Sequence, residues 1–216
     1  MKRNYYLTAV LLIAVVLVIS IVFYPRLPQK IPTHWNIHGQ VDGYGEKTYT
    51  AFLGPMIMTG LVVLFLFLPA LSPRRFEVDA TARPIYLYIM LLIVGLMGYF
   101  HLLSLLAALK QGFDAGRAMI GGLFLVMALL GNVLGKVPRN FYIGVRTPWT
   151  IADERVWFAT HRLAAKCMVA GSLLGFLAVV VEGWVAPGFV IYLVALFVPV
   201  VYSFICYRRL QRRGEV

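Results

Sequence analysis

Acidic residues, cysteine and the motifs of common enzyme classes are scarce or missing in this chain. Of its 216 residues only 9 are Asp or Glu and only 2 are Cys, so a disulfide framework is not indicated. The sequence contains no HExxH, GxSxG or P-loop motif, which leaves nucleophilic and metal-assisted chemistry without a recognisable site. These absences predict a protein that is not an enzyme and that needs no cofactor.

Long apolar runs are what the chain has in abundance. Hydrophobic residues make up 61% of the sequence and charged residues only 13%. Since a helix needs roughly 20 apolar residues to span a bilayer, six segments qualify as spans. They cover about residues 5–24, 51–71, 84–109, 117–134, 164–184 and 187–207. We therefore predict an all-α integral membrane protein, a bundle of six transmembrane helices.

The 20 Lys and Arg residues, with a formal net charge of +11, indicate how the chain is oriented. They fall between apolar runs and form no continuous stripe, so direct nucleic-acid binding is not expected. If both termini are cytoplasmic, the outer side carries only Arg26, Lys30, Lys47, Lys110 and Arg117. The positive-inside rule favours this arrangement. It predicts a multi-pass protein of the cell membrane, with cytoplasmic termini and membrane lipid as a partner.

The first long connection, residues 25–50, is predicted to be an ordered extracellular segment. Pro25, Pro28 and Pro32 disfavour helix in the residues before them, so the chain over residues 24–32 is expected to be extended. Further on, the dipeptide Asp42-Gly43 is typical of a turn. An ordered segment of this kind on the outer face predicts recognition of an extracellular molecule.

Four potential metal ligands in this segment, His34, His38, Asp42 and Glu46, recur every four residues. That spacing would stack them on one face of a helix, but each interior glycine among them would destabilise a helix by about 1 kcal/mol. In an extended chain the two histidines would lie about 13 Å apart, too far to share one zinc ion. We predict no metal site, and binding by His34 and His38 stays an alternative.

The second long connection, residues 135–163, is predicted to be a cytoplasmic amphipathic segment. Thr150 and Asp153 have the spacing of a capping box, which predicts a helix from Ile151. At about 100° per residue, such a helix separates a basic face from an aromatic one. The first face holds Arg155, Arg162 and Lys166, and the second holds Trp157, His161 and Ala164. Anionic lipid and a protein partner both suit this composition, and both interpretations stay open.

Polar residues within the predicted spans are few, and each is a candidate for function because burial in lipid is unfavourable. They are His101 in span three, Asn132 in span four and Glu182 near the outer end of span five. A pair between Glu182 and His101 would suit a small transporter or envelope-stress protein, although transporters usually bury more polar groups near the midplane. A metal-dependent membrane enzyme that uses the outer histidines is the second alternative.

Both long connections carry motifs that resemble the SdpI family of bacterial membrane immunity proteins. The outer run LPQKIPTHWNIHGQVDGYGEK resembles the family pattern LPxxIPxHWNxxGxxDGxxxK. The inner run GNVLGKVPRNFYIGVRTPWTIADERVWFATHRLAAK resembles the family's C-terminal domain. The resemblance implies an N-terminal domain over residues 1–75, span three over 76–110, and an SdpI-like domain over 111–216.

The resemblance also implies which residues act. Matching positions on the outside imply extracellular recognition by His34, Trp35, Asn36, Gly39, Asp42, Gly43 and Lys47. Matching positions inside imply partner binding by Asn132, Asn140, Gly144, Arg146, Thr147, Pro148, Trp149, Trp157, Thr160 and His161. The implied function is resistance to a secreted antimicrobial peptide toxin. The family's second activity is signal transduction, in which a small cytoplasmic DNA-binding autorepressor is captured at the membrane.

Overall fold

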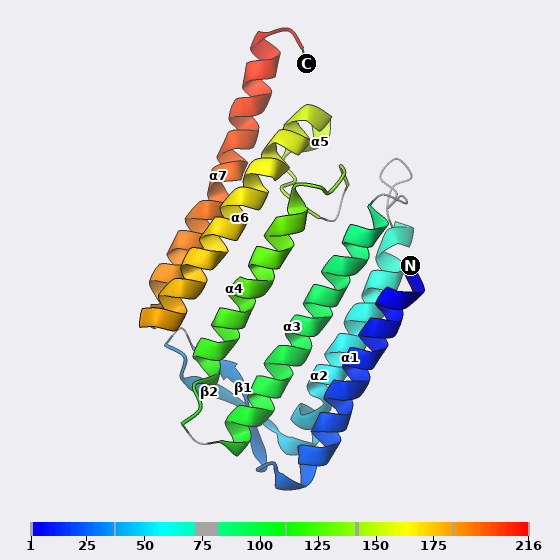
Figure 1. Ribbon diagram of the computed structural model, residues 1–216, viewed down its shortest axis with the longest axis vertical. Helices are drawn as coiled ribbons and strands as arrows, with labels where there is room; N and C mark the ends of the chain where they lie inside the picture. The colour runs from blue at the N-terminus through cyan, green and yellow to red at the C-terminus, as the bar shows by residue number, and fades with distance from the viewer. Residues whose placement is uncertain are drawn as a thin grey trace. The chain divides into compact units, whose positions relative to one another are not determined.

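The computed structural model describes residues 2–36, 38–71, 82–110, 112–140, 143–182 and 184–215 (Figure 1). The chain forms two compact units. Unit 1 comprises Met1–Leu68 and Leu87–Leu123, and unit 2 comprises Pro69–Tyr86 and Phe124–Val216.

Six helices in the described ranges are long and apolar enough to cross a membrane. They are Asn4–Arg26, Lys47–Leu71, Arg83–Leu109, Ala115–Leu134, Glu154–Val181 and Val185–Arg212. The predicted number of spans is confirmed, but the fifth begins at Glu154 and not near residue 164. The predicted span began after Arg162 because hydropathy falls there, but the exposed side chain of Arg162 leaves the helical backbone uninterrupted.

Unit 1 consists of helices that carry a small hairpin. Its elements are α1 (Lys2–Phe23), the 3-10 helix η1 (Tyr24–Arg26), β1 (Lys30–Trp35), β2 (Val41–Glu46), α2 (Lys47–Phe67), most of α3 (Arg83–Leu109) and the start of α4 (Ala115–Leu134) (Figure 1). A Cβ at Gly98 of α3 would lie 3.1 Å from Met58 of α2 and 3.2 Å from Val16 of α1, so the three helices pack closely. A second 3-10 helix, η2 (Leu68–Leu71), follows α2.

The hairpin corrects the prediction of an all-α fold, because the protein is mostly helical with one two-stranded antiparallel sheet. β1 and β2 pair from Lys30 opposite Glu46 to Trp35 opposite Val41. This pairing confirms that no helix runs through the four regularly spaced ligands. It also shows that the expected extended chain over residues 24–32 was wrong at its start, where η1 lies.

The turn of the hairpin lies at Asn36–Gln40 and not at the predicted Asp42-Gly43 pair. Gly39 adopts a φ of 76° there, a left-handed conformation that favours glycine. The Asn36 side-chain oxygen accepts the backbone N–H groups of His38 (2.9 Å) and Gln40 (3.1 Å), so its side chain supplies the bonds of an Asx turn. The competing signal at Asp42-Gly43 instead lies within β2.

Unit 2 contains the rest of α4, α5 (Pro148–Ala152), α6 (Glu154–Glu182) and α7 (Val185–Arg212). α6 and α7 run side by side (Figure 1), and a Cβ at Gly171 would lie only 2.7 Å from Ala195. The predicted capping box was placed three residues too late. Thr147 and Thr150 form the box that opens α5, whereas Asp153 ends α5 and its carboxylate accepts the first backbone N–H groups of α6.

Candidate functional site

An exposed histidine–aspartate pair marks the hairpin of unit 1. His34 Nδ1 on β1 lies 2.5 Å from Asp42 Oδ1 on β2, and their side chains are 71% and 44% exposed. Gly43 brings the strands together here, because a Cβ at that position would lie 2.8 Å from the Cβ of His34. The two strands therefore present a polar pair to solvent, where a ligand can reach it.

The turn of the hairpin is held against the start of α4. A Cβ added to Gly116 would lie 2.6 Å from the Cα of Gly39, so these two backbones touch. At the other end of the hairpin, Lys47 Nζ lies 4.8 Å from the centre of the Tyr24 ring, within the range of a cation–π contact. Gly39 and Lys47 from the predicted recognition set thus serve to position the hairpin.

A pocket of about 330 Å³ lies in unit 1 between β1, α2, α3 and the start of α4. Apolar side chains form most of its wall: Leu53, Ile57, Met97, Phe100, Met119 and Ile120. His34, Trp35 and Asn36 from the predicted recognition set also line it. An apolar pocket with a few convergent polar groups is typical of a binding site for a small or extended ligand.

Buried polar residues anchor the pocket wall. His101 of α3 lies in the wall and places its Nε2 2.8 Å from Ser20 Oγ of α1. Ser104, one turn further along α3, donates a hydrogen bond to the carbonyl of Pro32 in β1. Ser20 and Ser104 were not singled out from the sequence, because an isolated serine in an apolar helix carries no positional signal.

Two predictions about polar residues have different outcomes. The side chain of Glu182 lies outside what the structure describes, so its predicted pairing with His101 stays a prediction. Within the described ranges, no group of three or more His, Cys, Asp or Glu residues is arranged to hold a metal ion.

In unit 2, a buried Trp–His stack holds the loop between α4 and α5. The rings of Trp157 and His161 stack with centroids 4.0 Å apart, and Trp157 Nε1 donates to the carbonyl of Val137 at 2.8 Å. The backbone N–H of Val145 donates to His161 Nε2 at 3.0 Å. Because Nε2 accepts, the ring proton lies on Nδ1 and is donated to the carbonyl of Trp157 at 2.8 Å. The neutral imidazole is therefore a structural bridge.

The loop itself is shaped around that bridge. Gly144 has a φ of 115°, and a Cβ there would lie 2.0 Å from His161 Nε2. Asn140, which is buried, accepts the N–H of Ile143 at 2.7 Å and donates to the carbonyls of Pro138 and Ile143. Asn140 positions the loop and is not available to a partner, whereas Gly144 shapes the loop and is exposed.

Accessible members of the predicted partner-binding set form a smaller group. Asn132, Arg146 and Pro148 are exposed. Trp149 is half-buried, and its Nε1 donates to Ser203 Oγ of α7 at 2.5 Å. Thr147 is half-buried as the cap of α5, whereas Trp157, Thr160 and His161 are fully buried.

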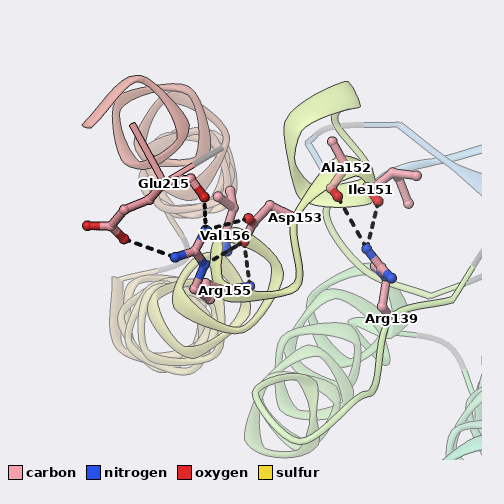
Figure 2. A network of polar contacts seen from close by, with 7 residues as sticks. All are labelled: Arg139, Ile151, Ala152, Asp153, Arg155, Val156 and Glu215. Carbon is pink, nitrogen blue, oxygen red and sulfur yellow. Dashed lines mark hydrogen bonds and ion pairs between the residues drawn. The ribbon is translucent and has the colours of Figure 1, made fainter. Parts of the chain in front are cut away.

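Figure 2 shows two arginines of unit 2, Arg155 at the start of α6 and Arg139, which bonds to the end of α5. Arg155 contacts the carboxylates of Asp153 and Glu215, both at 2.9 Å, and Arg139 donates to the carbonyl of Ile151 at 3.1 Å. Hydrogen bonding from Arg155 lowers the pKa of Asp153. The role of Glu215, 60 residues from Arg155 in the chain, could not be found from local patterns.

Six spanning helices, with an ordered hairpin in one unit and a clamped loop in the other, define a multi-pass helical membrane protein. Residues 136–203 match the SdpI/YfhL protein family, and residues 11–59 match a domain of unknown function (DUF1648). The chain is 28% identical to Immunity protein SdpI of Bacillus subtilis (strain 168), over 98% of this chain and 99% of that protein. No solved structure matches it.

The resemblance to the SdpI/YfhL protein family that the motifs predicted is thus confirmed. The two matched regions each contain one of the ordered connections. The hairpin lies within residues 11–59, and the loop with its Trp–His stack lies within residues 136–203.

Proposed function

We propose that this protein is a membrane immunity protein that protects the cell from a secreted peptide toxin, and that the hairpin and pocket of unit 1 recognise the toxin. The similarity to an immunity protein over nearly the full length supports the first part. The exposed His34–Asp42 pair beside an apolar pocket carries the second. A peptide could place an apolar side chain in the pocket and polar backbone groups against the pair.

The orientation of the chain is part of the proposal. The distribution of Lys and Arg favours cytoplasmic termini, which puts the connection between the first two spans outside the cell. A cysteine introduced at exposed Thr48 would then react with an impermeant maleimide in intact cells. One introduced at exposed Ala152 would react only after the membrane is permeabilised.

A protection assay tests the recognition site. The chain is expressed in a Bacillus subtilis strain that lacks its own Immunity protein SdpI, and the cells are challenged with the secreted sporulation-delay toxin. Leu53→Trp fills the pocket from α2, and Asp42→Ala removes one member of the exposed pair. Both variants should lose protection at unchanged membrane abundance. Val63→Trp is the matched control, because Val63 is also on α2 and about equally exposed but does not line the pocket.

Full protection by Leu53→Trp and Asp42→Ala would refute this site. Loss of protection by Val63→Trp as well would show only that α2 does not tolerate a large side chain.

We infer that the inner loop of unit 2 captures a cytoplasmic DNA-binding repressor. Exposed Arg146 beside half-buried Trp149, on a loop clamped by Trp157 and His161, supports this role, since Arg and Trp are enriched at protein-binding hot spots. Arg146→Ala should abolish co-purification with a co-expressed small DNA-binding autorepressor of the SdpI system. Arg209→Ala, which removes an equal charge from the exposed end of α7, should not. Undiminished co-purification by Arg146→Ala would leave the loop with a structural role.

A further inference from the structure

A basic cleft in unit 2 shares only Asn132 with the residues that were predicted to bind a partner. It has a volume of about 590 Å³ and lies between the end of α4, α6 and α7. Lys136, Arg162 and Lys166 line it together with Asn132 and Tyr202, and no acidic residue does. The cleft therefore offers three cations, an amide and a phenol to one occupant, which is a composition suited to a phosphate group.

These three cations have no partner within the described part of the chain. Their side chains form no hydrogen bond or ion pair there. The neighbouring basic residues differ, because Arg155 is held by two carboxylates and Arg139 by a backbone carbonyl (Figure 2). Charge left unneutralised in the cleft favours an anionic ligand.

An apolar groove adjoins the basic cleft. It has a volume of about 720 Å³ and is lined by Leu163 of α6 and by one face of α7, including Leu193, Phe197 and Tyr202. Leu163 and Tyr202 line both cavities, so the basic cleft opens onto the groove. The combined site is charged at one end and apolar along the rest, as an amphipathic ligand requires.

The dimensions of the groove indicate a lipid. Between Tyr202 and Leu193 the axis of α7 extends about 14 Å at 1.5 Å per residue, close to half of the roughly 30 Å hydrocarbon core of a bilayer. Lys136 lies two residues beyond Leu134, where the span of α4 ends. In α6 the apolar run predicted from the sequence begins near residue 164, between Arg162 and Lys166. We therefore place the three cations near the depth of lipid headgroups, and the groove has about the length of one leaflet.

We propose that unit 2 binds an anionic phospholipid, with its phosphate in the cleft between Lys136, Arg162 and Lys166 and one acyl chain along the groove on α7. The site does not depend on the toxin. A bound lipid would join the ends of α4, α6 and α7 by charge and by apolar contact.

Lipid titration of the purified full chain tests this site. The protein is placed in a neutral detergent and titrated with phosphatidylglycerol or with phosphatidylcholine of equal chain length, and bound lipid is counted by native mass spectrometry. Since each cation near an anionic headgroup contributes about 1 kcal/mol, each single Gln substitution should lower the affinity for phosphatidylglycerol about fivefold. The triple variant Lys136→Gln/Arg162→Gln/Lys166→Gln should bind about a hundredfold more weakly.

A matched control separates the cleft from net charge. Arg209→Gln/Arg212→Gln/Arg213→Gln removes the same charge from the exposed end of α7 and should bind phosphatidylglycerol like the wild type. Equal losses in the two triple variants would overturn the proposal, as would equal affinity of the wild type for phosphatidylcholine. If the cleft triple variant does not fold, the three single variants decide, and unchanged affinity in all of them also overturns it.

Two experiments distinguish a lipid headgroup from a free phosphate: competition with soluble phosphates, and a substitution in the apolar groove. A large excess of inorganic phosphate or glycerol phosphate should not displace the lipid, because neither occupies the groove. Displacement would instead identify a site for a free phosphate. Phe197→Asn, which makes the groove polar, should weaken binding of the long-chain lipid severalfold, and unchanged binding would refute the placement of the acyl chain.

Discussion

Replacing Gly144 by alanine should destabilise the inner loop through two separate effects. A φ of 115° lies where a residue with a Cβ is strained by about 1–2 kcal/mol. The new Cβ would also lie 2.0 Å from His161 Nε2, and the buried ring, stacked on Trp157, cannot turn away freely. Displacing it would break the Val145 N–H bond to Nε2, which adds about 1–2 kcal/mol.

Together these effects predict a loss of about 3 kcal/mol. For a chain of this length, that loss corresponds to a fall of roughly 6–12 °C in Tm. Heating the detergent-solubilised protein and measuring the folded fraction by fluorescence-detected gel filtration gives the apparent Tm. Gly112→Ala is the control, because Gly112 also has a positive φ (76°) but no neighbour within 4 Å of a new Cβ. It should lower the Tm by only about 2–4 °C.

A double-mutant cycle identifies which effect dominates. With His161→Ala as the background the clash is absent, so adding Gly144→Ala should lower the Tm only as much as Gly112→Ala does. An equally large fall in both backgrounds would refute the proposed clash. A fall no greater than that of Gly112→Ala in the wild-type background would show that the ring moves aside without loss.

Three further predictions concern other contacts. Gly116→Ala should lower stability by about 2 kcal/mol, measured as Tm, because its Cβ would lie 2.6 Å from the Gly39 backbone. Arg155 lowers the pKa of Asp153, so the wild type should be slightly more stable than Arg155→Gln above pH 4, and this difference should vanish in a titration to lower pH. Trp149→Phe, which loses one hydrogen bond, should be about 1 kcal/mol less stable in the same Tm assay.

Each of these predictions has an outcome that contradicts it. Wild-type Tm in Gly116→Ala would mean that the hairpin can separate from α4 without loss. A difference between Arg155→Gln and the wild type that grows toward acid pH would have the wrong sign for a carboxyl group whose pKa is lowered in the folded state. Trp149→Ala should be less stable than Trp149→Phe, because only Phe keeps a ring beside Phe204 (5.2 Å from Trp149). Equal stability would refute the role of that ring contact.

The spans could be predicted from sequence because their signal is additive along the chain. Runs of about 20 apolar residues identify a membrane helix without any knowledge of its neighbours. A helix from Ile151 was predicted from its cap, but the membrane span was predicted to begin only near residue 164, because Arg162 lowers the average hydropathy. That the helix is continuous from Glu154, with Val156 and Trp157 buried at its start, is evident only in the tertiary structure.

Local patterns were less reliable inside the two connections. Asp42-Gly43 is a strong turn signal by composition, yet Asn36 forms the turn with its side chain, and the contact of Gly39 with α4 holds it there. Likewise, Thr147 and Thr150, two threonines three residues apart, form a capping box. The prediction instead paired Thr150 with Asp153, because an acidic residue is usual three positions after the cap. For the hairpin, a contact distant in sequence accompanies one of two adequate local signals.

In each predicted site, some residues maintain the local structure and others are accessible to a ligand or partner. In unit 2, the side chains of Asn140, Trp157 and His161 all bond to the backbone and the last two stack on each other, so substituting them would test folding. In unit 1, Gly39 and Lys47 position the hairpin in the same way.

The proposed toxin and repressor would meet the exposed or half-buried members, chiefly His34 and Asp42 on the hairpin and Arg146 and Trp149 on the loop. If a variant of a buried residue loses activity, impaired folding is therefore the first explanation to test. An exposed-residue variant that keeps its Tm and loses protection identifies recognition itself, and for that reason Asp42→Ala is more decisive than any substitution of the buried motif residues.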